Sequence, residues 1–185
     1  MQGEGFHTGT PSVFIRFSGC NLRCAFCDTQ HSNHTMMSLP EIIDRVSLHP
    51  LASLIVLTGG EPSLHVDDDL IKALRMTGKT ITIETNGTVP IHHGIDWVTL
   101  SPKTAFEGGD LKPCVITQCD ELKVVYTGQD LTQYNNIKAK HRFLQPCFVT
   151  DHEQQQANVQ DCINAVLTHP NWRLSLQTHR ILCIR

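Results

Sequence analysis

The chain carries the stretch Cys20-Asn21-Leu22-Arg23-Cys24-Ala25-Phe26-Cys27, in which three cysteines are spaced C-x3-C-x2-C. Three thiolates this close together can hold three corners of a [4Fe–4S] cluster, whose irons prefer cysteine sulfur. The fourth iron then has no protein ligand nearby, so it can bind a substrate or cofactor and act on it. The spacing therefore favours a catalytic cluster over one that only transfers electrons.

A zinc site is the alternative interpretation of the same cysteines. Zinc usually takes four Cys or His ligands, often in two separated pairs, and His31 or His34 could supply the fourth ligand here. Cys114 and Cys119 could form a second metal pair, but no partner pair follows them. We interpret the five cysteines outside the triplet as small buried hydrophobic residues. They are Cys114, Cys119, Cys147, Cys162 and Cys183.

Composition points to one globular domain, residues 1–185, because 40% of the 185 residues are hydrophobic. The net charge is only −3 and there is no run of Lys or Arg, which argues against a nucleic-acid partner. The sequence has no secretory signal and no apolar stretch of membrane-spanning length. Eight cysteines without a signal peptide indicate a reducing, cytoplasmic setting rather than a disulfide framework.

Apolar runs rich in β-branched and aromatic residues alternate with helical patterns along the chain. Ser38 and Glu41 form a capping box before one helix, and residues 67–69 place acidic charge before another, at 70–76. Two more helices are expected at residues 130–140 and 153–167. The predicted strands are residues 13–17, 54–57, 81–84, 97–100, 122–126, 142–148 and 174–177. This alternation predicts an α/β fold with a mainly parallel sheet.

Polar or glycine-bearing segments follow the predicted strands, where α/β folds bind their ligands. The cysteine loop follows the first strand, and a polar segment follows each of five others. Six such segments at the same end of successive strands predict one shared site. Those after the cysteine loop are Thr58-Gly59-Gly60-Glu61-Pro62, Thr85-Asn86-Gly87-Thr88, Ser101-Pro102-Lys103, Gln145-Pro146 and Gln177-Thr178-His179.

Together these segments resemble one family, the 7-carboxy-7-deazaguanine synthases, which are radical S-adenosylmethionine (SAM) enzymes of 7-deazapurine (queuosine) biosynthesis. The resemblance runs from Met1 to His179 and so covers essentially the whole chain. The cysteine triplet and the Gly-Gly-Glu-Pro turn mark radical SAM proteins broadly. The narrower motifs are Gln2-Gly3-Glu4-Gly5, Cys27-Asp28-Thr29, Ser101-Pro102-Lys103 and Gln177-Thr178-His179.

The resemblance implies a reaction, the conversion of 6-carboxy-5,6,7,8-tetrahydropterin to 7-carboxy-7-deazaguanine with ring contraction and loss of ammonia. In the family an electron from the reduced [4Fe–4S] cluster cleaves SAM, and the resulting radical takes a hydrogen from the substrate. SAM is then reformed and acts as a cofactor. The implied fold is a partial, reduced (β/α)6-type radical SAM barrel. The implied partners are a reducing electron donor such as flavodoxin or ferredoxin and a second copy of the chain in a homodimer.

The resemblance also implies which residues bind the cofactors, with Cys20, Cys24 and Cys27 ligating the cluster. Gly59 and Gly60 would let carbonyl oxygens of their turn approach the SAM ammonium closely, although a Gly-Gly pair can also simply form a tight turn. A hydroxyl and an ammonium suit the SAM ribose and carboxylate, although the lysine of Ser-Pro-Lys can also be an ordinary surface residue. The implied cofactor-binding residues are Phe26, Cys27, Asp28, Gly59, Gly60, Ser101, Lys103, Gln145 and Pro146.

For the substrate, the resemblance points first to Arg16, since a guanidinium can hold a carboxylate through two parallel hydrogen bonds. An arginine facing outward from an alternating strand is the alternative. Acidic and amide groups near the N-terminus can pair with N–H donors of the pterin ring. His179 is interpreted as structural, with contact to the substrate as the alternative. The implied substrate-binding residues are Met1, Gln2, Gly3, Glu4, Arg16, Thr58 and Arg185, the last through its terminal carboxylate.

Family members use Mg2+, and the residue two positions after the third cysteine supplies an oxygen ligand, which here is Thr29. Asp28 would be the more natural ligand by charge. Family members also carry a strand before the Gln-Gly-Glu-Gly motif, whereas here Met1 falls almost inside it. Terminal residues fray unless they are tied down, so how firmly Gln2 to Glu4 are held is an open question from sequence.

Two other functions share some of these features. A radical SAM activating enzyme for a glycyl-radical partner would have the cysteines and the Gly-Gly-Glu-Pro turn, but would not need Arg16. A non-enzymatic zinc-binding module would need only the cysteines and a histidine. Metal analysis separates the zinc-binding module from the cluster enzymes. Iron and sulfide in a brown protein support the cluster, whereas zinc in a colourless protein excludes it.

Overall fold

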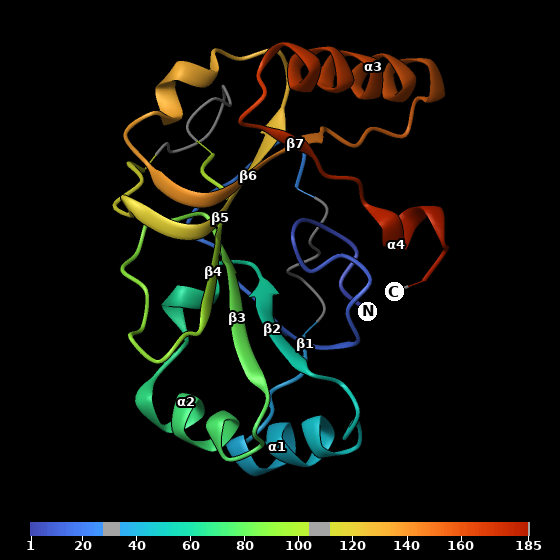
Figure 1. Ribbon diagram of the computed structural model, residues 1–185. Coiled ribbons are helices and arrows are strands. Elements are labelled where there is room, and N and C mark those ends of the chain that lie inside the picture. The colour runs from blue at the N-terminus through green and yellow to red at the C-terminus, as the bar shows by residue number, and fades with distance from the viewer. Residues whose placement is uncertain (28–33, 104–111, 185) are drawn as a thin grey trace.

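A single seven-stranded sheet organises the part of the chain that the computed structural model describes, residues 1–27, 34–103 and 112–184. Every neighbouring pair in it is parallel, and the strands follow one another in chain order. The sheet curves but its first and last strands do not pair (Figure 1), so it forms a partial rather than a closed barrel. The strands are β1 (Ser12–Phe17), β2 (Leu54–Gly59), β3 (Thr80–Thr85), β4 (Trp97–Leu100), β5 (Gln118–Tyr126), β6 (Lys138–Pro146) and β7 (Arg173–Leu174).

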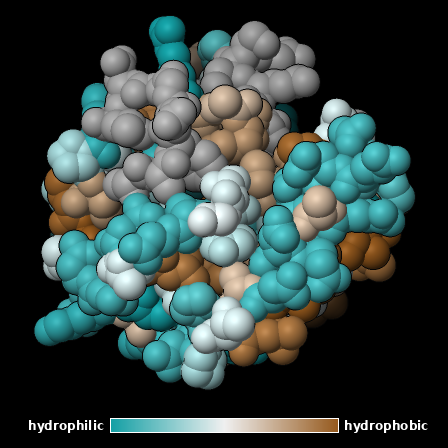
Figure 2. Space-filling view, turned by 90° about the horizontal axis from the view of Figure 1, so that it is seen from above, coloured by the Kyte–Doolittle hydropathy of each residue, from teal (hydrophilic) through white to brown (hydrophobic). Residues whose placement is uncertain are grey.

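Helices cover one face of the sheet, in two groups. Helices α1 (Leu39–Ser47) and α2 (Asp68–Arg75) pack against β1 to β3, and α3 (His152–Thr168) packs against the later strands (Figure 1). Strand alternation sends Ile55 and Leu57, for example, toward the helices and leaves the residues between them on the opposite face. The outer surface over α3 is mostly hydrophilic (Figure 2), as expected for a helix with one face in the core.

The predicted helix starts are present. The backbone N–H of Ser38 donates to the Glu41 carboxylate at 2.7 Å, which completes the capping contact of α1. Asp67 accepts a hydrogen bond from the backbone N–H of Leu70 at 2.9 Å at the start of α2. These contacts satisfy backbone donors that the first turn of a helix leaves without a partner.

The helix predicted over residues 130–140 is wrong. The structure has a short 3-10 turn, η2 (Leu131–Tyr134), and β6 already begins at Lys138. Leu131, Tyr134 and Ile137 are all buried in the core under α3, so their three-residue spacing imitates a helical stripe. The backbone N–H of Lys138 instead donates to the Thr117 carbonyl at 2.8 Å and begins the pairing of β6 with β5.

The predicted final strand is also too long. β7 contains only Arg173 and Leu174, and the segment after Gln177 forms a short helix, α4 (Thr178–Ile181). The Ser175 N–H still bonds to the Leu144 carbonyl at 2.8 Å, so pairing with β6 ends there. The chain then turns toward the N-terminal segment, and the two lie on the same side of the sheet (Figure 1).

The N-terminal segment is tied down, which answers the question left open by the sequence. The Gln2 N–H donates to the Thr10 carbonyl at 2.9 Å, and the Gly3 carbonyl accepts from the Thr178 N–H at 2.9 Å. Phe6 stacks on Trp97, with ring centroids 4.8 Å apart, and on His141, at 4.3 Å. These contacts hold the segment against the face of the sheet that the helices leave uncovered. None of the helices in the described part of the chain has the length and apolar character needed to cross a membrane.

Candidate active site

A cavity of about 680 Å³ opens on the uncovered face of the sheet, toward the carboxyl ends of the strands. Every predicted site residue that the structure describes lines it, whereas Asp28, Thr29 and Arg185 lie outside the described residues. His179, which was interpreted as structural, also lines it. The predicted residues brought together are Met1, Gln2, Gly3, Glu4, Arg16, Cys20, Cys24, Phe26, Cys27, Thr58, Gly59, Gly60, Ser101, Lys103, Gln145 and Pro146.

Strand register explains why Arg16 reaches this cavity. Val13, Ile15 and Phe17 pack toward the helices, so the alternating residues Phe14 and Arg16 face the other way. Arg16 is paired in register with Thr58 on β2, which also lines the cavity. The guanidinium carbon lies 5.1 Å from the centre of the Phe14 ring, within the range of a cation–π contact. The arginine therefore faces the cavity rather than bulk solvent on the helical side.

The cysteine loop is held by the Gly-Gly-Glu-Pro turn. The Gly60 N–H donates to the Phe17 carbonyl at 2.8 Å, and the Glu61 N–H donates to the Gly19 carbonyl at 3.0 Å. A Cβ on Gly60 would lie 1.9 Å from the Gly19 carbonyl oxygen, so a side chain cannot fit. Gly60 therefore has a packing role against the loop that bears Cys20, in addition to its place on the cavity wall.

The three cysteines of the triplet fit an iron–sulfur cluster. All three line the same cavity, and the Leu22 N–H donates to the sulfur of Cys20 at 3.5 Å. Burial raises the pKa of Cys24, and the nearby Lys103 opposes that shift. A metal that replaces the proton removes this cost of ionisation, because metals bind the thiolate.

Lys103 lies half-buried beside the cysteines. Its ammonium donates to the Ser101 hydroxyl at 2.5 Å and lies 5.8 Å from the centre of the Phe26 ring. Burial lowers the pKa of Lys103, while Cys24 opposes that effect. A partly buried ammonium of this kind favours an anionic ligand, because the ligand's charge would offset the cost of desolvation.

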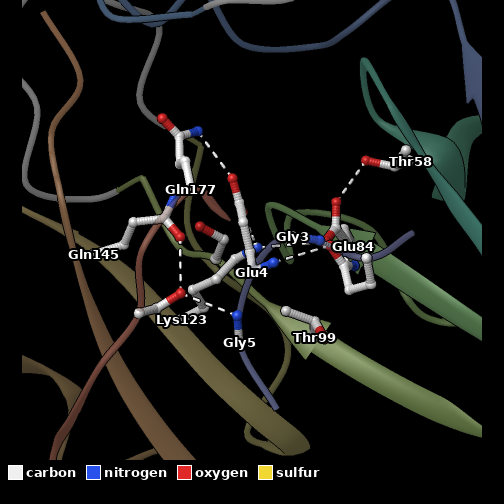
Figure 3. A network of polar contacts seen from close by, with 12 residues as sticks. Gly3, Glu4, Gly5, Thr58, Glu84, Thr99, Lys123, Gln145 and Gln177 are labelled. Atoms are coloured by element: carbon white, nitrogen blue, oxygen red, sulfur yellow. Dashed lines mark hydrogen bonds and ion pairs between the residues drawn. The ribbon is translucent and has the colours of Figure 1, made fainter. Parts of the chain in front are cut away.

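The same cavity also holds a network of acidic and amide side chains around Lys123 (Figure 3). The Lys123 ammonium is ion-paired with Glu4 and, at 3.3 Å, with Glu84. Glu84 also accepts hydrogen bonds from the Thr58 hydroxyl at 2.8 Å and the Gln2 amide at 3.1 Å. The Gln177 amide donates to Glu4 at 2.8 Å. Residues from both chain ends and three strands thus meet in one network.

Burial and neighbouring charges together set the pKa directions of Glu4, Lys123 and Glu121 in this network. Burial alone would raise the pKa of Glu4, but the paired Lys123 outweighs it, so the pKa is lowered and Glu4 is ionised. Burial would likewise lower the pKa of Lys123, yet Glu4, Glu84 and Glu121 together raise it. Burial raises the pKa of Glu121, which accepts from the Phe6 N–H at 3.0 Å. The network thus presents a carboxylate-rich wall with one cation inside it.

Sequence reasoning did not identify Glu84, Asn86, Lys123 and Gln177 as individual site residues. A signal existed for two of them. On β3 and β5, charged Glu84 and Lys123 alternate with core residues such as Ile83 and Leu122. A charged residue inside a parallel strand that helices should cover is unusual, so this alternation indicates a polar face.

Asp68, His92 and His93 form a separate group whose potential ligand atoms lie within 4.8 Å of one another. His92 uses both ring nitrogens, however. Its Nε2 lies 2.8 Å from an Asp68 carboxylate oxygen, and its Nδ1 accepts from the Gly94 N–H at 3.0 Å. The pairing therefore serves to fix the loop before β4 against α2 and leaves His92 no lone pair for a metal.

The family model of the radical SAM superfamily matches residues 14–113, which include the cysteine triplet and the turn after β2. A 7-carboxy-7-deazaguanine synthase of Bacteroides thetaiotaomicron is 54% identical over 185 residues, covering 100% of this chain and 94% of its own. One from Bradyrhizobium diazoefficiens is 41% identical over 209 residues, covering 100% and 95%.

Solved structures agree with the fold. The crystal structure of QueE from Escherichia coli superposes with a TM-score of 0.74 at 28% identity, covering 97% of this chain and 90% of that one. Streptococcus suis SuiB bound to S-adenosylmethionine superposes with a TM-score of 0.60 at 17% identity, covering 90% and 50%, which supports the fold alone. The radical SAM match and the full-length relatives argue against both a zinc module and a glycyl-radical activating enzyme.

Proposed function

Given that the chain belongs to the radical SAM superfamily and, within it, to the 7-carboxy-7-deazaguanine synthases, we propose that the described cavity converts 6-carboxy-5,6,7,8-tetrahydropterin to 7-carboxy-7-deazaguanine with loss of ammonia. The main support is that one cavity joins the cysteine triplet to Arg16 and to the Glu4–Glu84–Lys123 network. Cofactor chemistry and recognition of an anionic, N–H-rich ring thus share one cavity.

Arg16 binds the substrate carboxylate in this proposal. The guanidinium offers two parallel N–H donors, which match the two oxygens of a carboxylate. Glu4 and Glu84 offset the charge of Lys123, so an anionic ligand is directed to the arginine rather than to that network. Arg16 therefore sets the orientation of the ring within the cavity.

The carboxylate-rich network forms hydrogen bonds with the pterin ring in this proposal. Tetrahydropterin carries N–H donors along its edge, and the carboxyl groups of Glu4 and Glu84 carry acceptor oxygens. Gln2 contributes an amide on the same wall and is itself held by Glu84. Lys123 holds the two acids in position through its ion pairs, so that the acceptors are in place before the substrate enters. His179 lies beside Gly3 on the same side of the cavity and serves to close it.

The cofactors occupy the end of the cavity that holds the cysteines. Cys20, Cys24 and Cys27 hold the cluster. Ser101 and Lys103 bind the polar groups of SAM. When bound, the cluster and SAM supply the radical that removes a hydrogen atom from the substrate. The remaining residues assigned to SAM by the family pattern line the same cavity, and they are Phe26, Gly59, Gly60, Gln145 and Pro146.

Several parts of the proposal rest on the family pattern alone. They are Mg2+ bound through Thr29, Asp28 beside SAM, and the terminal carboxylate of Arg185 near the substrate. The same applies to Met1 as a substrate contact, to the homodimer, to a flavodoxin or ferredoxin donor and to a cytoplasmic setting. Omitting Mg2+ during turnover tests the Thr29 assignment, since loss of activity on its removal is expected for a metal that positions the substrate.

The substrate carboxylate provides the sharpest test. Turnover of 6-carboxytetrahydropterin is compared with that of the matching 6-carboxamide, which has a similar shape but no charge. We expect the carboxamide to lose about 100-fold in kcat/KM, because a charge-assisted bidentate contact contributes about 1.5–3 kcal/mol. Equal turnover of both compounds would contradict the assignment of Arg16 as the carboxylate ligand.

A further inference from the structure

Asn86 lies at the end of β3, next to the cysteine loop. Its side chain is almost completely buried, with the residue 8% exposed. The amide nitrogen Nδ2 lies 3.8 Å from the sulfur of Cys20 and 3.1 Å from the side-chain oxygen of Asn21. The amide therefore faces both a cluster ligand and the loop that carries it.

The orientation of this amide is fixed by its other end. Oδ1 of Asn86 accepts from the Thr88 backbone N–H at 2.9 Å and from the Thr88 hydroxyl at 2.7 Å. A backbone N–H can only donate, so the atom facing Thr88 must be the oxygen and the atom facing Cys20 must be the NH2 group. The hydroxyl of Thr88 in turn accepts from the Asn21 amide at 2.8 Å.

The backbone of Asn86 is held equally firmly. Its N–H donates to one Glu61 carboxylate oxygen at 2.7 Å, and the Thr85 hydroxyl donates to the other, also at 2.7 Å. Glu61 is fully buried and comes from the turn after β2. The network therefore joins the ends of the first three strands, and it sets the amide in place before any cofactor binds.

We propose that Asn86 is a positioning residue that donates an N–H to the Cys20 sulfur and thereby raises the reduction potential of the cluster. This inference rests on the cluster assignment in the proposed function. One electron from an external low-potential donor adds negative charge that the ligand sulfurs share, and no bond forms or breaks in that step. A hydrogen-bond donor stabilises the more negative state, so it makes reduction easier. The Leu22 N–H, 3.5 Å from the same sulfur, acts in the same sense.

Two variants test the role in the reconstituted full-length enzyme without SAM. Asn86→Asp retains an acceptor toward Thr88 but loses the donor, and Asn86→Leu loses both. The measurement is a redox titration followed by the EPR signal of the reduced cluster. For Asn86→Asp we expect the ratio of reduced to oxidised cluster at a fixed potential to fall about tenfold. This corresponds to a midpoint potential that is lower by about 59 mV for a one-electron couple. Asn86→Leu should shift in the same direction.

Asn164→Asp is the matched control, because it makes the same chemical change on the exposed face of α3 and should leave the potential unchanged. A wild-type potential in Asn86 variants that carry full iron and a normal EPR signal would contradict the proposal. A wild-type enzyme without iron or signal would instead contradict the cluster assignment itself, so the two failures are distinguishable.

If neither Asn86 variant retains iron, a second measurement uses the wild-type enzyme. Asparagine labelled with 15N only in its side-chain amide is incorporated, and pulsed EPR is recorded on the reduced cluster. A coupling to the label is expected from an N–H···S contact. The absence of any such coupling would overturn the proposal without requiring a variant that folds.

Discussion

Lys123 on β5 is ion-paired with Glu4, a residue 119 positions earlier in the chain, in the wall of the cavity. The side chains are 7% and 14% exposed, so both charges are largely removed from water. The pair joins the N-terminal segment to the sheet, and the same ammonium reaches Glu84 on β3. One buried cation thus ties the N-terminal segment to the sheet, and in the proposed function it also positions the acids that recognise the substrate.

Replacing that cation should destabilise the protein. Lys123→Met leaves Glu4 and Glu84 buried without their partner, and we expect unfolding free energy to fall by about 3–5 kcal/mol. Denaturant unfolding measures this directly. The double variant Lys123→Met/Glu84→Gln removes one of the stranded charges and should recover part of the loss. No recovery in the double variant would show that the lost stability does not come from unpaired carboxylates.

Arg16 should control substrate use and not cofactor loading. Arg16→Ala is expected to lower kcat/KM by about 100-fold, or about 2.7 kcal/mol, while iron content stays at the wild-type level. Arg16→Lys keeps the charge but not the two parallel donors, so it should fall between wild type and alanine. Wild-type turnover in Arg16→Ala would refute the carboxylate contact.

The cysteine triplet should be required for iron in a way that other cysteines are not. Cys24→Ala is expected to lose the cluster and with it SAM cleavage, as measured by iron and sulfide content and by formation of 5′-deoxyadenosine with reductant in the absence of substrate. Cys162 is the matched control, because it is fully buried in the core beneath α3, where burial raises its pKa to about 12. Cys162→Ala should retain iron. Iron retained in Cys24→Ala would contradict the ligand assignment.

His7 should make the fold sensitive to mild acid. Its Nε2 is buried and has no hydrogen-bond partner among the described residues, and burial together with His141 lowers its pKa below the ordinary 6.5. The unfolded chain therefore takes up this proton at a higher pH than the folded one. The free energy of unfolding should decrease as pH falls from 6.5 toward the lowered pKa, and stay level with respect to His7 below that.

The variant His7→Phe keeps an aromatic ring against Trp97, whose centroid lies 4.6 Å from that of His7, but cannot be protonated. Its loss of stability between about pH 7.5 and pH 5.5 should be smaller than that of wild type. His152→Gln, at an exposed site at the start of α3, should leave the pH dependence unchanged. A pH profile of His7→Phe parallel to wild type would exclude this role.

Much of the site could be predicted because its residues follow strand ends. The segments at Cys20, Gly59, Ser101 and Gln145 each lie at or just after the carboxyl end of a parallel strand. Parallel strands place these ends along one edge of the sheet. Arg16 was found through the family resemblance, and the register of β1 with β2 accounts for its place in the cavity.

The missed features depend on contacts between distant parts of the chain. Lys123 and Glu84 lie inside strands, and only the return of Glu4 onto the sheet shows what they do. Asn86 was noted only as part of a turn, since its contact with Cys20 spans 66 positions. The helix predicted at residues 130–140 is wrong for the same reason, namely that long-range packing cannot be seen in the sequence. Leu131, Tyr134 and Ile137 are buried because a 3-10 turn and the residue before β6 pack on one core, and not because they share a helix face.

The most direct test of the central claim is anaerobic turnover by the iron–sulfur-reconstituted enzyme, with reductant, SAM, Mg2+ and 6-carboxytetrahydropterin, followed by mass detection. We predict formation of 7-carboxy-7-deazaguanine, with ammonia released in equal amount. Formation of 5′-deoxyadenosine without that product, in enzyme carrying a full cluster, would support the radical SAM chemistry and contradict the substrate assigned to this cavity.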